Sequence, residues 1–87
     1  MTIAFVPVVR ERLSDEVLRR IRDSIQSGEY RAGDQLPPIA AQARMFRVAA
    51  ATVREALLKL EAQRFVEIRH GTGVFVTQRR SARATER

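Results

Sequence analysis

Three stretches of the chain carry apolar residues at the spacing of an amphipathic helix. The first stretch is predicted to form a helix over 14–27, because Ser14 is suited to cap its start and Gly28 to end it. The apolar side chains of this helix share one face: Val17, Leu18, Ile21 and Ile25. The pattern predicts that this face packs against the rest of the domain.

A second, shorter helix is predicted to begin near Pro38, where a proline costs no internal hydrogen bond, and to end around Arg47. After a turn at 48–50, a third helix is predicted to reach about Gln63. Its apolar residues form one stripe: Val53, Ala56, Leu57 and Leu60. Its charged residues lie off that stripe: Arg54, Glu55, Lys59 and Glu61. The exposed face of the third helix is therefore rich in groups that can contact a partner.

Two short runs rich in β-branched residues, 66–69 and 74–77, flank the segment His70-Gly71-Thr72-Gly73. This pattern is typical of two antiparallel strands joined by a glycine-bearing hairpin loop. The predicted fold class is mainly α with a small antiparallel β-hairpin: a winged helix-turn-helix of three helices plus a wing, over 13–77. Residues 1–12 are predicted to form an extended lead-in, and 78–87 a basic flexible tail or a truncated linker.

The composition favours a nucleic-acid partner. The chain of 87 residues has a net charge of +6 and a sequence pI of about 11.4. Almost all of its cations are arginines, whose planar fork suits phosphate and guanine. Charge alone would also fit RNA, an acidic protein or a membrane surface. The order of helices and hairpin decides between these, because a helix fits the major groove and a preceding helix braces it.

Several other classes of function are disfavoured. The chain has no cysteine, which excludes disulfides, thiol nucleophiles and Cys-based zinc sites and fits a reducing cytoplasm. With one histidine and no arrangement of nucleophile, base and acid, neither an enzyme nor a metal or cofactor site is expected. The apolar run from Ile3 to Val9 is too short to span a bilayer, so no membrane partner is expected.

The third helix is predicted to be the recognition helix, with Arg54 making a bidentate contact to a guanine. An alternative is that Arg54 is a solvated residue paired with a neighbouring carboxylate. His70, at the hairpin tip, is either solvated or inserted into a narrow minor groove. The full set of predicted DNA contacts is Arg44, Arg47, Ala50, Ala51, Thr52, Arg54, Glu55, His70, Gly71 and Thr72.

Three motifs in order give the chain a family resemblance over about 13–76. They are Gly33-Asp34-Gln35-Leu36-Pro37, then Thr52-Val53-Arg54-Glu55-Ala56-Leu57 with Leu60-Glu61, then Gly71-Thr72-Gly73-Val74-Phe75-Val76. With these motifs the sequence resembles the GntR family of bacterial transcription regulators, specifically the amino-terminal domain of its fatty-acid-regulator-like branch.

The resemblance implies a cytoplasmic, nucleoid-associated repressor or activator that binds a palindromic operator in double-stranded DNA as a homodimer. Helix three would enter the major groove and the wing tip the minor groove. The family normally adds a carboxy-terminal domain that senses a small-molecule effector. Because no such domain follows here, the resemblance implies a DNA-binding fragment in which 78–87 begins the linker.

The sequence departs from the family pattern at three places. Pro38-Ile39-Ala40 replaces the usual serine, glutamate and arginine at the start of the second helix, and Ala49-Ala50-Ala51 replaces a serine and an arginine before the third. Arg64 stands where a glycine is usual, so a positive φ or a changed turn is expected there. The alanines either contact thymine methyl groups or indicate weak or altered binding. The alternative function is a winged-helix module with a non-specific nucleic-acid or protein-interaction role.

Overall fold

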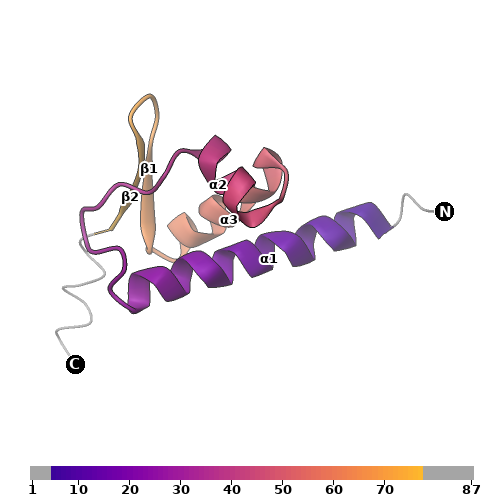
Figure 1. Cartoon of the computed structure of the whole chain (residues 1–87), viewed down its shortest axis with the longest axis horizontal. Helices are drawn as coiled ribbons and strands as arrows, with labels where there is room; N and C mark the ends of the chain where they lie inside the picture. The colour runs from indigo at the N-terminus through magenta and orange to yellow at the C-terminus, as the bar shows by residue number, and fades with distance from the viewer. Residues whose placement is uncertain (1–4, 78–87) are drawn as a thin grey trace.

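A computed structural model describes the backbone of residues 5–77 and the side chains of 11–77. Three helices precede a two-stranded antiparallel hairpin: α1 (Phe5–Gln26), α2 (Ile39–Phe46), α3 (Ala50–Ala62), β1 (Val66–Arg69) and β2 (Gly73–Val76). The α2–α3 pair and the hairpin all lie on the same side of the long helix α1, and the hairpin tip points away from it (Figure 1). The winged helix-turn-helix architecture is therefore confirmed, whereas the predicted tail at 78–87 lies outside the described residues.

Helix α1 begins much earlier than predicted. It starts at Phe5, so the prediction of an extended lead-in is wrong for residues 5–12. Pro7 is the third residue of α1, and a proline is tolerated there because the first backbone N–H groups of a helix have no internal partner. Ser14 does not cap the helix. It lies inside it, fully buried, with its hydroxyl donating to the carbonyl oxygen of Glu11 at 3.0 Å.

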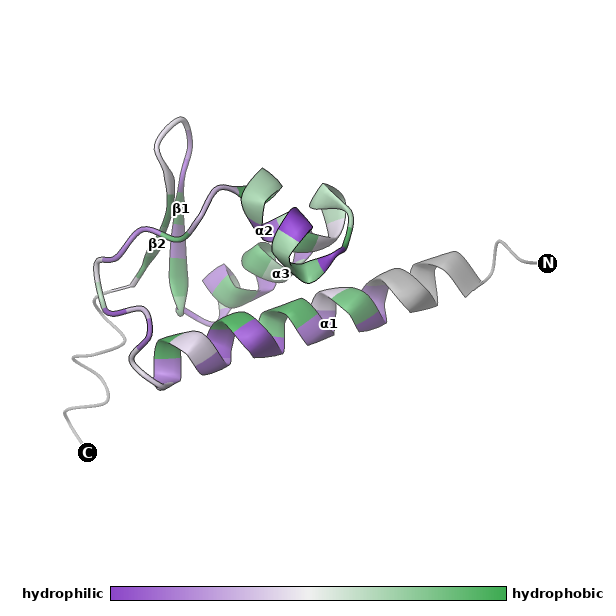
Figure 2. Ribbon diagram, in the orientation of Figure 1, coloured by the Kyte–Doolittle hydropathy of each residue, from purple (hydrophilic) through white to green (hydrophobic). Residues whose placement is uncertain are grey.

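The core lies between α1 and α3. Over the residues whose side chains are described, one face of α1 is mainly apolar and points towards α2 and α3, while its other face is polar (Figure 2). The predicted apolar stripes of both helices are buried and belong to one cluster: Val17, Leu18, Ile21, Ile25, Val53, Ala56, Leu57 and Leu60. Leu36, Val66, Val74 and Val76 join this cluster from the loop and the hairpin. Burial of these side chains is the main force that holds the recognition helix in place.

A tight turn sets the angle between α2 and α3. Arg47 ends α2 by adopting a left-handed conformation with φ 58°, and the N–H of Val48 donates to the carbonyl oxygen of Ala43 at 3.0 Å. The start of α2 is fixed by Gln42, a buried side chain whose Nε2 donates to the carbonyl oxygen of Pro37 at 2.7 Å. Both helices have the limits that the sequence predicted, within one or two residues.

The wing is broader than a simple hairpin. Strand β2 pairs with β1 in the register Val66↔Val76 to Arg69↔Gly73, so it begins one residue before the prediction. The other edge of β2 pairs with the loop after α1: the N–H of Gly33 donates to Val76 O at 2.9 Å and that of Leu36 to Val74 O at 2.8 Å. The loop thereby anchors the wing to the helices. Arg64, in the turn before β1, has φ 67°, which confirms the positive φ expected at this position.

Candidate nucleic-acid interface

The exposed face of α3 lies opposite its buried stripe. Ala51, Arg54 and Leu58 are exposed and Glu55 is half-buried, so these residues form the surface that α3 offers to a partner. The flanks of the helix are occupied by contacts within the domain. Lys59 reaches α1 on one flank, and on the other the Glu61 Oε2 atom accepts a hydrogen bond from the N–H of Ile68 in β1 at 3.1 Å.

Lys59 ties the recognition helix to α1. Its Nζ atom donates to Ser14 Oγ at 3.0 Å and to Asp15 Oδ1 at 2.9 Å. The hydrogen bond to Asp15 raises the pKa of Lys59 above its ordinary value, although partial burial opposes the shift. This explains why Ser14 is buried inside α1, since its hydroxyl accepts from a cation that reaches across from α3. Lys59 is therefore used inside the domain, unlike Arg54.

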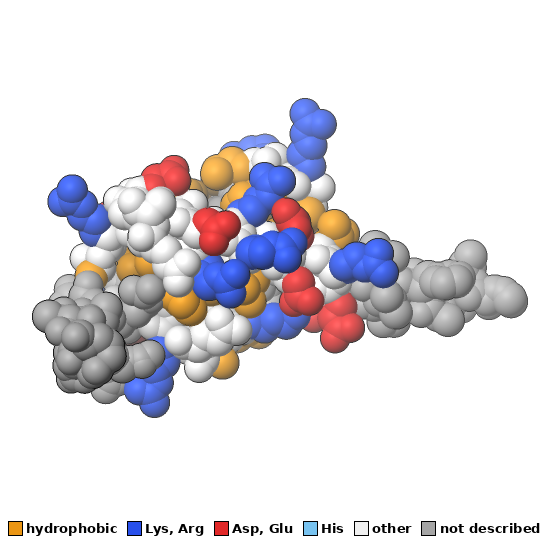
Figure 3. Space-filling model, turned by 90° about the horizontal axis from the view of Figure 1, so that it is seen from below, with side chains coloured by type: hydrophobic (Ala, Val, Ile, Leu, Met, Phe, Trp, Pro, Cys, Tyr) orange, Lys and Arg blue, Asp and Glu red, His pale blue; other side chains and the backbone are white. Residues whose placement is uncertain are grey.

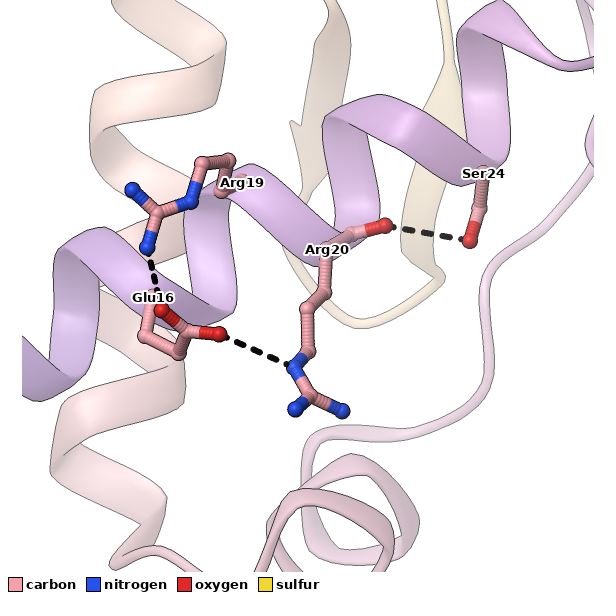
Figure 4. Close-up of polar contacts among 4 residues, drawn as sticks. All are labelled: Glu16, Arg19, Arg20 and Ser24. Atoms are coloured by element: carbon pink, nitrogen blue, oxygen red, sulfur yellow. Dashed lines mark hydrogen bonds and ion pairs between the residues drawn. The ribbon is translucent and has the colours of Figure 1, made fainter.

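Arg54 is exposed and makes no ion pair or side-chain hydrogen bond among residues 11–77. The alternative of an arginine paired with a neighbouring carboxylate is thus not supported. Two arginines of α1 behave differently: Arg19 and Arg20 both bind the carboxylate of Glu16 (Figure 4), which lowers the pKa of Glu16, chiefly through the bond from Arg19. The guanidinium of Arg54 is free to donate to an external acceptor.

The face of the molecule formed by α1 carries cationic and anionic side chains intermingled, as Figure 3 shows from below. Such a mixed surface has no strong attraction for the uniform negative charge of a phosphate backbone. Arg44 and Arg47, at the end of α2, are exposed and have no side-chain partner among the residues that the structure describes. Two unpaired arginines therefore lie at the turn between α2 and α3, whereas Arg19 and Arg20 on α1 are paired with Glu16.

The alanine-rich start of α3 has no side-chain cap. Ala49 is the N-cap residue and provides no side-chain hydrogen bond, as its replacement of the family serine implied. Ala50 is half-buried and Ala51 is exposed. Thr52 is only 3% exposed, so a contact between its side chain and a base would require the first turn of α3 to open. We expect Thr52 to hold this turn in place rather than to touch DNA with its hydroxyl.

The tip of the wing exposes His70, Gly71 and Thr72, the three wing residues that the sequence singled out. Gly71 has φ 78°, a conformation that favours glycine at the turn. Beside the tip, the guanidinium of Arg69 lies over the ring of Phe75 at 4.4 Å and also bonds Glu67 at 3.3 Å. Arg69 was not among the predicted contacts. Its position at the end of the strand that leads to the tip could have indicated that Arg69 lies beside the predicted minor-groove contacts.

Gln35 is a second residue that sequence reasoning missed. It lies in the loop after α1, in the motif with Gly33 and Pro37, and its Nε2 atom donates to the carbonyl oxygen of Thr72 at 3.1 Å. The same side chain packs on Gly73, where a Cβ atom would collide with the Gln35 amide. Gln35 thus supports the wing tip from the side of the helices. No local pattern indicated a contact between residues this far apart in the sequence.

Replacing Gly73 with alanine is expected to destabilise the wing. Gly73 has φ 138°, and the added Cβ atom would also displace Gln35, so we expect a loss of about 1–2 kcal/mol in the free energy of unfolding. Gly28→Ala is the matched control, because Gly28 also has positive φ but open space around it. Amide hydrogen exchange at 70–73 should accelerate in Gly73→Ala and not in Gly28→Ala. Equal exchange in the two variants would show that Gln35 does not hold the tip.

Among the described residues, no three His, Cys, Asp or Glu side chains lie close enough to hold a metal ion. Within the same part of the chain, no helix combines the length and the apolar character needed to cross a membrane.

Comparison with known proteins identifies a family whose model matches most of this chain. The model of the bacterial regulatory proteins of the gntR family matches residues 13–76, which run from the middle of α1 to the end of β2. The chain belongs to the gntR family. The match begins at Leu13, so the first turns of α1 precede it.

Members of the gntR family similar to this chain are themselves named as regulators. The chain is 38% identical over 76 residues to the Uxu operon transcriptional regulator of Escherichia coli K12, covering 87% of this chain and 30% of that protein. It is 43% identical over 65 residues to the putative regulator RmpR of Mycobacterium gastri, covering 72% of this chain and 24% of that protein. The chain thus spans less than a third of these relatives' length. Their description as regulators agrees with the expectation that this chain is not an enzyme.

Solved structures of the gntR family share the architecture. The DNA-binding domain of AraR in complex with operator ORX1 aligns with a TM-score of 0.73 and 25% identity, covering 75% of this chain and 78% of that one. A GntR family transcriptional regulator from Listeria monocytogenes aligns with a TM-score of 0.74 and 27% identity, covering 84% of this chain and 65% of that one. The AraR domain, whose structure was solved in complex with its operator, therefore has a backbone similar to that of this chain.

Proposed function

We infer that this gntR-family domain binds an operator in double-stranded DNA and thereby regulates transcription, with α3 in the major groove and the wing tip in the minor groove. The observation that carries the proposal is Arg54. It projects from the exposed face of α3 without an internal partner among the described residues. Helix α3 itself lies on the side of α1 that also bears the wing (Figure 1). A bidentate arginine is the commonest specific contact to guanine in the major groove.

The surrounding residues divide into three roles. Arg44 and Arg47 contact phosphates beside the major groove, because they flank the turn between α2 and α3. Arg54 and Glu55 contact base edges, Glu55 as an acceptor for the amino group of cytosine. His70, Gly71 and Thr72 follow the minor groove, where a small tip with an imidazole N–H donor suits the concentrated negative potential. The operator complexes of AraR support this arrangement by their similar fold.

The domain would act as a homodimer on a palindromic operator. Two copies of one recognition helix read two half-sites about one helical turn apart, so the symmetry of the protein appears in the DNA. We expect the isolated chain to be a monomer in solution that pairs on DNA. A small-molecule effector belongs to this proposal only if a further domain accompanies the chain in the cell, in keeping with the length of its relatives. Binding would take place on DNA in the bacterial cytoplasm.

The affinity of the domain for duplex DNA should fall steeply with salt. If about four to six phosphates are neutralised, the logarithm of the association constant should fall against that of the salt concentration with a slope near −4 to −5. Fluorescence anisotropy with a labelled duplex between about 50 and 200 mM salt gives this slope. Arg44→Ala should reduce its magnitude by about one unit, whereas Arg19→Ala, on the face of α1, should leave it unchanged. An affinity that does not depend on salt would contradict DNA binding.

One observation favours a second candidate, a winged-helix module that binds nucleic acid or protein without sequence preference. Helix α3 has Ala49 as its N-cap residue with no side-chain cap, and Ala40 and Ala50 stand where the family resemblance implies arginines. Such a module would keep the salt dependence but bind all duplexes equally. The two candidates therefore differ in base preference and not in their response to salt.

A further inference from the structure

The outermost row of α3 is mainly apolar. The helical repeat brings four residues together on the side of α3 opposite the buried stripe, at positions 51, 55, 58 and 62. Three of these four residues are apolar: Ala51, Leu58 and Ala62. Leu58 is 59% exposed, so most of its side chain is in contact with water. Among the described residues, Leu58 is neither in the buried cluster nor among the side chains packed against it. On a surface that faces DNA, such a leucine can contact an apolar group of the bases.

Leu58 is separate from the other exposed large hydrophobic residues. Among residues 11–77 these are Leu13 and Met45, and both line one groove of about 260 Å³ between α1 and α2 that does not include Leu58. The three side chains therefore do not form one continuous patch of the kind that marks a protein-binding surface. One turn before Leu58 on α3 lie Arg54 and Glu55, which are the base-contacting residues of the proposed function, and one turn after it lie Glu61 and Ala62.

We propose that Leu58 and Ala51 contact the C5-methyl groups of thymines in the major groove, on either side of the guanine bound by Arg54. The inference rests on the proposed function and adds to it the base composition of the half-site. The thymine methyl is the apolar group that the major-groove edges of the four bases present. Burying leucine against that methyl removes apolar surface of both partners from water, which is favourable. Against any other base edge the leucine would cover polar atoms without bonding them.

The order of the residues along α3 sets the order of the bases they contact. Seven residues separate Ala51 from Leu58, which corresponds to about 10 Å along the helix axis at roughly 1.5 Å per residue. Arg54 lies between the two apolar residues along the axis. The expected half-site therefore has a guanine between two thymine positions, on either strand.

Replacing thymine by deoxyuridine tests this directly, because it deletes the methyl group and leaves every hydrogen-bonding atom in place. A duplex selected from a random pool is synthesised with each thymine changed to deoxyuridine in turn, and the dissociation constant is measured for each. At the two contacted positions we expect affinity to fall about three- to fourfold, which corresponds to the free energy gained by burying one methyl group. At other thymines the affinity should not change.

Leu58→Ala assigns one of these positions to its residue. The variant should lose the thymine preference at that position, so that the thymine and deoxyuridine duplexes bind equally, while the preference at the Ala51 position remains. Ala51→Gly should give the reverse pattern. The ratio of affinities for the two duplexes cancels any general loss of binding or folding in a variant. Leu13→Ala, also an exposed leucine but on α1, is the matched control and should keep both preferences.

Each other outcome would overturn the inference. If the chain selects a sequence but tolerates deoxyuridine everywhere, or if Leu58→Ala keeps both preferences, Leu58 does not contact thymine and the proposed function stands without it. If Leu58→Ala instead changes only self-association in sedimentation, the leucine faces a second copy of the chain. If no sequence is selected, the proposed function fails and the thymine contact fails with it.

Discussion

Arg54→Ala is expected to weaken binding to the preferred duplex by about 1–3 kcal/mol and to relax the preference at one guanine. The reason is geometric, because the guanidinium donates two parallel hydrogen bonds that match the O6 and N7 atoms of guanine. The side chain makes no ion pair among the described residues, so its removal should not unfold the domain. Dissociation constants for duplexes with each of the four base pairs at that position measure the effect.

Two further variants separate base recognition from charge. Arg54→Lys keeps the positive charge but replaces the planar fork with a point donor, so it should retain phosphate attraction while losing part of the guanine preference. Arg19→Ala removes one positive charge from α1, where the arginine binds Glu16, and should leave the base preference unchanged. A small, equal loss on every sequence in Arg54→Ala would contradict a base contact and favour the non-specific module.

Leu60→Ala is expected to destabilise the domain by about 2–5 kcal/mol, the range for truncating a buried leucine. Leu60 is 0% exposed and belongs to the core between α1 and α3. For a domain of about 70 ordered residues the total free energy of unfolding is about 4–11 kcal/mol, so the variant should lose a large part of it. Because α3 is positioned by this core, DNA binding should be lost in proportion to the unfolded fraction.

Leu58→Ala gives the matched comparison, since it truncates the same residue type in the same helix two positions earlier. Leu58 is largely exposed, and its truncation should change the free energy of unfolding by no more than about 0.5 kcal/mol. Urea unfolding followed by circular dichroism gives both values. Similar losses in the two variants would mean that the burial pattern of α3 described above is wrong.

The helical and strand periods of the sequence were sufficient to predict α2, α3 and the hairpin, because their apolar residues face one core. They failed only at the start of α1. Pro7 lies in the first turn of the helix, where a proline is tolerated, and Ser14, which was expected to cap the helix, lies inside it. Ser14 is buried because Lys59 of α3 binds its hydroxyl, which is a contact between residues 45 positions apart. A local pattern does not contain such tertiary information.

The candidate interface was likewise predicted from the sequence only in part. Arg54, Arg44 and the wing tip were named from the sequence, and all of them are exposed in the structure. The burial of Thr52 was not foreseen, because the first turn of a helix often faces outwards and only the packing of α3 turns this residue inwards. Gln35 was also missed, since its role depends on a hydrogen bond to Thr72 in the wing.

Selection from a pool of random duplexes is the measurement that tests sequence-specific recognition by α3 most directly. Repeated rounds of binding and amplification with the 87-residue chain, at a stated salt concentration, should enrich a palindrome whose half-sites contain a guanine flanked by thymines, separated by about one turn of the double helix. A pool that stays random after several rounds, with equal affinity for all its members, would contradict it.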